Sequence, residues 1–206
     1  MYARSTTIMG PSDAIDSGVT MFRDDVMPSV MQMDGCIGAS LMVDRESGRS
    51  IATTAWESMD AMRASAEQVK PLRERTTERM GGTAQVEEWE IGALHREHHA
   101  GSGACTRVTW MEMESGSVDR ALEVFRSDTL PALDEIEGFC SASLMVDRTT
   151  GRLVITASYR DRQALEGSRE RAMDLRDTGA DDIGAKITDV REFELVVANL
   201  RVPETV

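Results

Sequence analysis

The three histidines, which are the side chains best suited to act as a general base near neutral pH, lie close together in one short segment. His95, His98 and His99 surround Glu97 in a stretch rich in glycine, serine and charge. Imidazole and carboxylate groups can bind a metal, but a metal site needs ligands held by rigid elements and supported by a second layer of contacts. A solvated linker offers neither, so we predict no metal site here.

No other group of side chains has the spacing of a familiar catalytic set. The sequence contains no Cys–His pair, Ser–His–Asp set, glycine-rich phosphate loop or zinc spacing. Acid–base chemistry would therefore fall to carboxylates with shifted pKa values, such as Glu90, Glu192 or Glu194. The residues alone predict no cofactor and leave the catalytic residues unknown.

Three pairs of side chains occupy equivalent places in the two halves of the chain. They are Arg4 and Arg107, Phe22 and Phe125, and Trp56 and Tyr159. A guanidinium can anchor an anionic or phenolate ligand, and an aromatic ring can stack on a flat one. An arginine paired with a carboxylate and an aromatic plug of the core are the structural alternatives, and both stay open. We take these six residues as the candidate ligand-binding set.

An internal repeat makes these positions equivalent. The string Ala39–Arg45 returns as Ala142–Arg148, an offset of 103 residues (142 − 39), and residues 38–56 and 141–159 share 10 identities in 19 positions. Near the end the offset becomes 104, as expected for one inserted loop residue. The repeat is as long as a domain, so we predict two units, 1–92 and 104–206, joined by a linker at 93–103.

Each unit is predicted to contain strand, helix, strand, strand, helix and strand. First strands are expected at 3–9 and 106–112, with Ser12 and Ser115 as N-caps of the helices that follow. Pro28 and Pro131 should break or kink these helices. The second helices are expected to begin at Ser58 and Asp161, to be interrupted at Pro71, and to end near 79 and near 177.

A hairpin is predicted between the second and third strands, with turns at Asp44–Arg49 and Asp147–Arg152 held by a local Asp–Arg pair. Last strands are expected at 84–91 and 188–196. This βαββαβ order is the ferredoxin-like α+β fold, with both helices on one face of an antiparallel sheet. Its bare face carries apolar side chains, so we expect the two units to pack sheet to sheet.

Composition and charge narrow the classes of partner. The net charge of −13 disfavours binding to nucleic acid and to anionic lipid. No apolar run is long enough to span a membrane, and the N-terminus has no apolar signal core. Three cysteines without a spacing pattern are typical of small buried side chains, not of a disulfide framework. These observations predict a cytoplasmic protein.

The closing residues of the third strands resemble a known family. An aromatic, a small or acidic residue, and an acidic-Ala-hydrophobic step appear in Trp56–Met62 and, less regularly, in Tyr159–Leu165. With the unit length and element order, they resemble the dimeric α/β barrel superfamily and its antibiotic biosynthesis monooxygenase-like branch. The resemblance implies an intramolecular pseudo-dimer, with further oligomerisation possible, and a ligand between the helices and the sheet of each unit.

What the resemblance implies about activity divides into alternatives. The first is cofactor-independent oxygenation of a small aromatic or polyketide-like molecule, in which Arg4 or Arg107 would stabilise developing negative charge. The second is a non-catalytic small-molecule-binding or stress-associated protein, and the third is a pseudo-dimer in which only one copy binds. Family helices carry a histidine where this chain has Ser65, Ala66, Ser168 and Arg169. That departure argues against haem degradation.

Overall fold

The computed structural model describes residues 1–98, 100–200 and 202–205, and it divides into two compact units. Unit 1 comprises Met1–Trp89 with Glu194–Val202, and unit 2 comprises Glu90–Phe193 with Pro203–Val206. The split differs from the boundary expected at residue 92, because each unit includes part of the long last strand that begins in the other half of the sequence.

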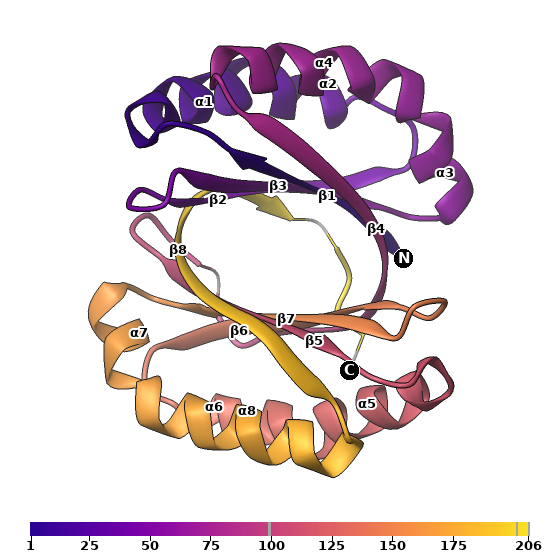
Figure 1. The fold of residues 1–206 in the computed structure, drawn as a ribbon, viewed down its shortest axis with the longest axis vertical. Helices are drawn as coiled ribbons and strands as arrows, with labels where there is room; N and C mark the ends of the chain where they lie inside the picture. The colour runs from indigo at the N-terminus through magenta and orange to yellow at the C-terminus, as the bar shows by residue number, and fades with distance from the viewer. Residues whose placement is uncertain (99, 201, 206) are drawn as a thin grey trace. The chain divides into compact units, whose positions relative to one another are not determined.

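Both halves contain the same series of elements (Figure 1). In the first half they are β1 (Tyr2–Met9), η1 (Ser12–Ala14), α1 (Ile15–Met21), η2 (Phe22–Val26), α2 (Met27–Val30), β2 (Cys36–Asp44), β3 (Arg49–Trp56), α3 (Met59–Ala64), α4 (Ala66–Arg79) and β4 (Thr83–Arg96). In the second half they are β5 (Cys105–Glu112), η3 (Ser115–Ser117), α5 (Val118–Val124), η4 (Phe125–Thr129), α6 (Leu130–Asp134), β6 (Phe139–Asp147), β7 (Arg152–Tyr159), α7 (Arg162–Gly167), α8 (Arg169–Ile183) and β8 (Lys186–Leu200).

The strands are hydrogen-bonded in the closed order β1-β3-β2-β8-β5-β7-β6-β4. Neighbouring strands such as β1 and β3, or β2 and β3, pair antiparallel, and the order β4-β1-β3-β2 is that of a ferredoxin-like unit. The fold class is therefore the tandem α+β barrel that the sequence predicts. Within each unit the helices lie along one face of the sheet, as α5, α6 and α8 do on β5, β6 and β7 (Figure 1).

The last strands are longer than expected because each continues beyond its own βαββαβ repeat. In β4, residues Glu90–Arg96 pair with β6, and in β8, residues Glu194–Leu200 pair with β2. The first four residues of the expected linker, Ala93–Arg96, are therefore strand. Ala93 and Leu94 are buried there, which explains why these apolar side chains occur in a segment that otherwise looks like a linker.

The helix that follows each first strand begins differently from the expectation. Ser12 and Ser115 lie inside short 3-10 turns and cap no helix with their side chains. Pro28 and Pro131 do not break the helix. Because proline has no N–H and its ring pushes away the carbonyl four residues earlier, the preceding turn widens. It becomes the π-helical η2 in one unit and η4 in the other.

The second helix of each unit begins where predicted, since Ser58 and Asp161 accept hydrogen bonds from the N–H groups of Ala61 and Ala164. It is interrupted at Ser65 and Ser168 and not at Pro71, which lies within α4. The expected end near residue 177 is also wrong. Helix α8 runs through Gly179 to Ile183, and Gly184 ends it in the left-handed conformation (φ 66°).

The hairpin turns form as predicted, and the aspartate of each turn also bonds to the turn backbone. Asp44 Oδ1 accepts hydrogen bonds from the N–H groups of Glu46 and Ser47, and Asp147 does the same in unit 2. Arg45 pairs with Asp16 and Glu194. Asp44 lies opposite Arg49, and Asp147 lies opposite Arg152, where each turn joins its strands, so the backbone contacts of the aspartate occur beside the expected local Asp–Arg pairing.

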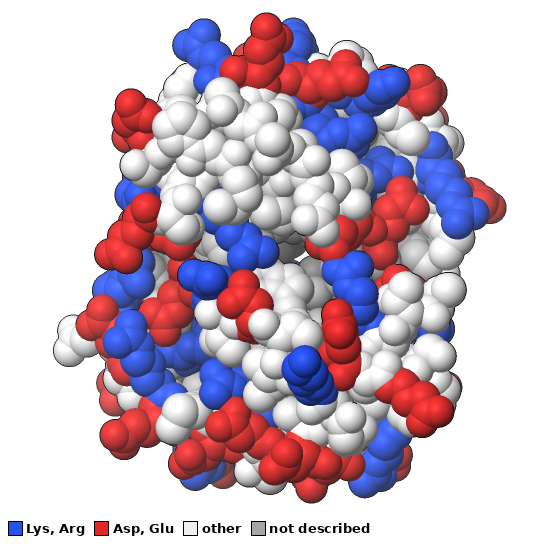
Figure 2. Space-filling view, in the orientation of Figure 1, with Lys and Arg blue, Asp and Glu red and all other residues white. Residues whose placement is uncertain are grey.

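Each unit has its own apolar core between helices and sheet, with Trp56 and Phe22 in unit 1 and Tyr159 and Phe125 in unit 2. Acidic and basic side chains are interspersed over the face drawn in Figure 2. Among the described residues, no helix combines the length and the hydropathy that a membrane-spanning segment requires.

Candidate functional site

A cavity of about 60 Å³ lies within unit 2, between the sheet and the helices. Strands β5, β6 and β7 form its floor, and α5, η4, α6 and α8 form its roof. Most of its walls are aliphatic, from side chains such as Leu144, Leu153, Ile155 and Leu175. A cavity with apolar walls and few polar groups is the usual form of a small-molecule site.

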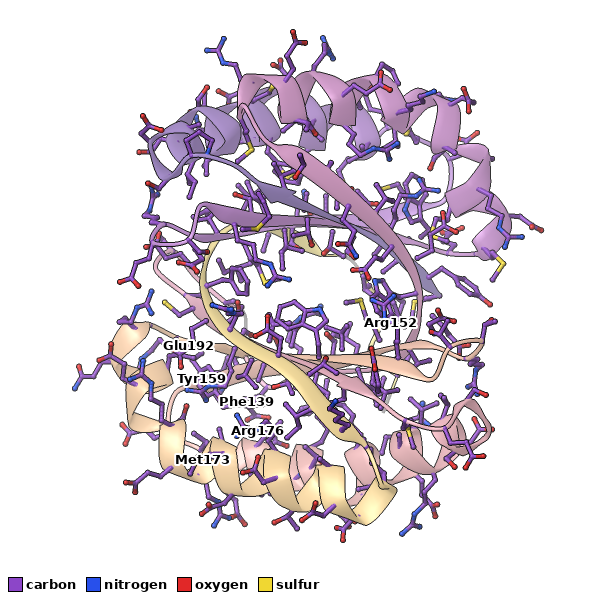
Figure 3. The ribbon with its side chains drawn as sticks, viewed as in Figure 1. Phe139, Arg152, Tyr159, Met173, Arg176 and Glu192 are labelled. Carbon is purple, nitrogen blue, oxygen red and sulfur yellow. The ribbon has the colours of Figure 1, made fainter. Side chains whose placement is uncertain are left out.

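Three of the six predicted ligand-binding residues line this cavity together. Arg107 comes from β5, Phe125 from η4 and Tyr159 from the end of β7. Phe125 reaches the cavity because the π-helical turn carries it and Thr129 on the inner side of the helix. Figure 3 shows Tyr159 in the layer between the sheet and α8. The sequence repeat thus identified three side chains that meet at one place, although they are far apart in the chain.

Arg107 is buried and its polar contacts are specific. It donates hydrogen bonds to Ser168 Oγ (3.0 Å), to the carbonyl oxygen of Leu165 (2.9 Å) and to Glu192 Oε1 (2.9 Å). The Leu165 carbonyl oxygen, which accepts one of these hydrogen bonds, lies in α7 just before the break between α7 and α8. The structural reading of Arg107, an arginine with a carboxylate partner, is therefore correct at the level of contacts.

Tyr159 adds a polar group of a different kind. Its side chain is fully buried, and its hydroxyl oxygen accepts a long hydrogen bond from Arg107 Nη1 (3.4 Å). The guanidinium also lies 5.6 Å from the centre of the phenol ring, within the range of a cation–π contact. Among the described residues the phenol hydrogen has no acceptor, and Tyr159 is one of the residues that line the cavity.

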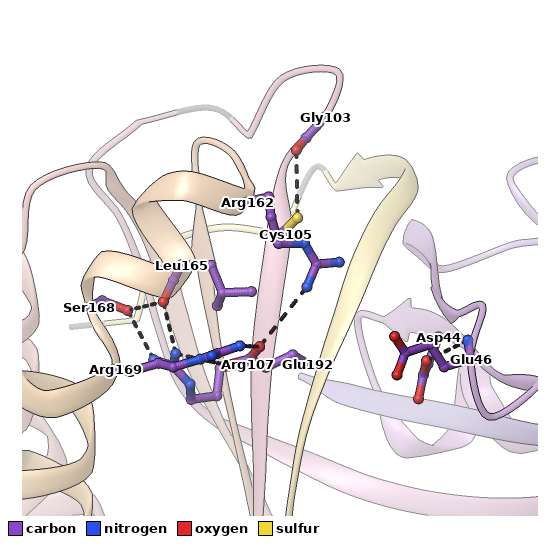
Figure 4. A network of polar contacts seen from close by, with 10 residues as sticks. All are labelled: Asp44, Glu46, Gly103, Cys105, Arg107, Arg162, Leu165, Ser168, Arg169 and Glu192. Carbon is purple, nitrogen blue, oxygen red and sulfur yellow. Dashed lines mark hydrogen bonds and ion pairs between the residues drawn. The ribbon is translucent and has the colours of Figure 1, made fainter.

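Glu192 on β8 holds the network from its other side (Figure 4). Besides Arg107, it accepts hydrogen bonds from Arg169 (2.8 and 3.2 Å), and Arg162 lies 4.0 Å away. Burial by itself would raise the pKa of Glu192, but the hydrogen bonds from Arg169 and Arg107 outweigh it and hold the pKa below its ordinary value. Glu192 is therefore an anion at neutral pH and is poorly suited to act as a base.

Sequence reasoning missed the α8 side of the cavity. Ala172, Arg176, Gly179 and Ile183 line it at spacings of four, three and four residues, which is one face of a helix. Arg176 is largely buried, with 21% of its side chain exposed, and donates a hydrogen bond to Asp177. The signal was present in the sequence, but ending the helix near Asp177 removed half of this face from consideration.

The other three predicted residues are packed inside unit 1. Arg4 repeats the contacts of Arg107, bonding to Ser65, to the carbonyl of Met62 and to Glu88. Trp56 is fully buried, and its Nε1 donates to Thr54 Oγ1 (3.0 Å).

Phe22, like Trp56, belongs to the core of unit 1. The surroundings of Trp56 and Phe22 are those of aromatic side chains in a hydrophobic core, which is the structural alternative to ligand binding.

The histidine segment contains one compact group of possible metal ligands. His95 Nε2 lies 3.0 Å from Asp134 Oδ1, and Glu97 brings a ligand atom within 4.8 Å of both. His95 is on β4, but Glu97 and Asp134 are exposed. The His95–Asp134 contact can be an ion pair or a hydrogen bond without any metal. The expectation that no metal binds here stays a prediction. His99 lies outside the described residues.

The cysteines offer no nucleophile to the cavity. Cys105 and Cys140 are buried, Cys36 is half-buried, and all are free thiols. Burial raises the pKa of Cys36 and of Cys140, which favours the neutral thiol. No histidine, cysteine or carboxylate is among the described residues that line the cavity.

Comparison with known sequences identifies relatives along the whole chain. The mycobacterial proteins Rv2557 and Rv2558 of Mycobacterium tuberculosis H37Rv, both named as uncharacterized proteins, are 51% and 48% identical to it. The matches cover all of this chain and 92% and 88% of theirs. The chain belongs to the same family as these proteins. No protein-family model matches it.

Comparison with solved structures confirms the fold. An anthrone oxidase-like protein superposes with a TM-score of 0.67 at 13% identity, covering 99% of this chain and 95% of that one. A monooxygenase-like protein of Listeria innocua has a TM-score of 0.53 at 8% identity, covering 94% and 93%. The heme-degrading enzyme LmHde of Listeria monocytogenes has a TM-score of 0.52 at 9% identity, covering 94% and 99%.

These similarities identify the fold as that of the antibiotic biosynthesis monooxygenase-like dimeric α/β barrel proteins, as the resemblance predicted. At such low identity they concern the fold alone.

Proposed function

We propose that the chain binds a small, mainly apolar molecule in the unit 2 cavity, with one hydrogen-bond acceptor of that molecule against the Tyr159 hydroxyl. The observation that carries this proposal is a buried phenol whose hydrogen has no acceptor among the described residues, at the wall of an apolar cavity. A buried donor without an acceptor is costly, and a ligand that supplies one recovers that free energy.

The dimensions of the cavity limit the ligand. Its volume of about 60 Å³ is small, well below the roughly 300 Å³ typical of sites for drug-sized molecules. It is also below the roughly 150 Å³ of a cavity that holds benzene, so a single aromatic ring fits only when the side chains of the cavity wall move outward. Arg107 and Arg176 favour an acceptor that is neutral or anionic over one that is cationic.

Gly179 offers a way to test the proposal by closing the cavity. The nearest atom to a Cβ built there is Thr129 Oγ1 at 3.8 Å, so a side chain fits and extends toward η4, where Thr129 also lines the cavity. We expect Gly179→Leu to weaken binding of 4-methylphenol at least tenfold, measured by calorimetry. Gly179→Ala should retain binding and should raise the free energy of unfolding by about 1 kcal/mol, because alanine favours a helix over glycine.

The polar part of the proposal has its own variant. Tyr159→Phe removes only the hydroxyl, and the loss of one neutral hydrogen bond of about 1 kcal/mol corresponds to roughly fivefold weaker binding. If 4-methylphenol shows no saturable binding to the wild-type chain up to its solubility, the proposal is wrong.

A second candidate function is cofactor-independent oxygenation of a phenolic molecule at this cavity. The observation that favours it is the presence of two guanidinium groups and a phenol donor at one apolar cavity, where negative charge that develops on a substrate would be stabilised. The similarity in fold to an anthrone oxidase-like protein supports the same direction. The reaction would convert a CH2 group and O2 into a carbonyl group and water, with no external reductant.

The absence of a base among the described cavity residues restricts this reaction to substrates that ionise readily without one. We expect an active chain to consume oxygen with such a phenolic substrate in the presence of a metal chelator, and Gly179→Leu to abolish that consumption. No oxygen uptake across a panel of monocyclic phenols that carry an activated CH2 group would reject oxygenation while leaving the binding proposal in place. A cytoplasmic location stays a prediction.

A further inference from the structure

We infer that the ligand site belongs to unit 2 alone, because unit 1 fills the equivalent space with its own side chains. The inference rests on the proposed binding function and adds which repeat performs it and which positions decide this. Although the repeats have the same fold, the positions around Tyr159 and their equivalents around Trp56 differ in volume from one unit to the other.

The helices supply the first half of the difference. Ala172 and Gly179 on α8 line the cavity of unit 2, and their equivalents on α4 are Val69 and Thr76. Val69 and Thr76 are both 8% exposed, so their additional atoms point into the core of unit 1. Thr76 Oγ1 also donates to the carbonyl of Leu72 (2.8 Å), which holds its side chain in place.

The sheet supplies the second half. Tyr159 and Ala157 in β7 correspond to Trp56 and Thr54 in β3. The larger indole is fully buried, and its N–H is already bonded to the Thr54 hydroxyl. At the position of Tyr159, unit 1 therefore has a larger side chain whose polar hydrogen already has an acceptor.

At the opposite end of the same layer, unit 1 has the smaller sheet residues, Ser50 and Ala52 in place of Leu153 and Ile155. There Met80 compensates, since its sulfur would lie only 2.7 Å from a Cβ placed on Gly18. The buried side chain of Met80 thus fills space that is equivalent to that of the Ala121 methyl group in unit 2. At this end of unit 1 the buried Ser50 hydroxyl has no hydrogen-bond partner among the described residues, but Ser50 is six residues from Trp56 along β3 and is not at the position of the Tyr159 hydroxyl.

Exchange of the four side chains that differ around Tyr159 and Trp56 tests the inference. The closing variant carries Ala157→Thr, Tyr159→Trp, Ala172→Val and Gly179→Thr, and the opening variant carries Thr54→Ala, Trp56→Tyr, Val69→Ala and Thr76→Gly. We expect one molecule of 4-methylphenol per wild-type chain, none for the closing variant and two for the opening variant. Methyl NMR of Leu175 and its equivalent Leu72, with 4-methylphenol as the probe, identifies the unit that binds.

The outcomes separate the inference from the proposed function. Two molecules per wild-type chain, or shifts at Leu72 and not at Leu175, would overturn the inference while leaving small-molecule binding intact. No binding to the wild-type chain would reject the proposed function itself. If the opening variant does not fold, the closing variant still tests the inference. A closing variant that binds 4-methylphenol without a shift of the Leu175 methyl signals would contradict the assignment of the site to unit 2.

Discussion

Replacement of Trp56 by alanine is expected to lower the free energy of unfolding by about 3–5 kcal/mol, the cost typical of deleting a large buried aromatic side chain. Trp56 has no exposed surface and lies in the core of unit 1 with Phe22 and Met62. Its removal leaves a cavity and also leaves the Thr54 hydroxyl without its indole donor. Urea denaturation of the two chains measures the effect.

Tyr159→Ala is the matched control for this substitution. Tyr159 is equally buried but already borders an open cavity, so its neighbours lose fewer contacts when it is removed. We expect a smaller loss of stability than for Trp56→Ala, together with a loss of 4-methylphenol binding. Equal losses of stability and of binding for the two variants would show that the repeats are equivalent, against the inference above.

Glu192→Gln is expected to destabilise the protein by about 2 kcal/mol at pH 7. Loss of one partner from a fully buried ion pair costs roughly 3–5 kcal/mol, and the partial exposure of Glu192 reduces this figure. The side chain of Glu192 is 21% exposed and accepts hydrogen bonds from both Arg107 and Arg169. Without its charge, the buried guanidinium of Arg107 loses its carboxylate partner.

The equivalent carboxylate in unit 1, Glu88, supplies the control. It is 42% exposed and pairs with Arg4, while the positions of Arg162 and Arg169 hold Met59 and Ala66 in that unit. Because Glu88 is twice as exposed as Glu192 and lacks the second arginine partner, Glu88→Gln should destabilise the protein less than Glu192→Gln does. A loss for Glu88→Gln as large as that for Glu192→Gln would contradict the role assigned to the additional arginine.

The pH dependence of this difference has a definite sign. The pKa of Glu192 is lower in the folded protein than the ordinary value of about 4.3 that applies when the chain is unfolded. Its stabilising contribution is therefore complete above about pH 5 and declines as the pH falls through the lower, folded-state pKa. The difference in stability between wild type and Glu192→Gln should shrink below pH 5, and a constant difference down to pH 2.5 would exclude this linkage.

The sequence by itself was sufficient for the repeat, the strand and helix order, and the fold. Apolar alternation in Ala39–Val43 and its copy, and the Asp–Gly turns at Asp44–Gly48, are local patterns whose periods match strand and turn geometry. The repeat also identified Arg107, Phe125 and Tyr159 as positions that belong together. Local signals failed where a contact between residues distant in sequence sets the structure. The second helix of unit 1 is interrupted at Ser65, which bonds to Arg4, and not at Pro71, where the sequence predicted the interruption.

Only the tertiary structure revealed the cavity beside Tyr159, on which the assignment of the ligand site to unit 2 is based. A cavity is the space left between several elements, so its volume depends on the sum of side chains that no local window contains. Gly179 is ordinary as a helix residue and Trp56 is ordinary as a strand residue. Their significance appears only when α8 is seen above Tyr159 and when Thr76 is seen in the position of Gly179. The pattern of apolar and turn residues determines the fold, whereas the volumes of the packed side chains determine where a cavity remains.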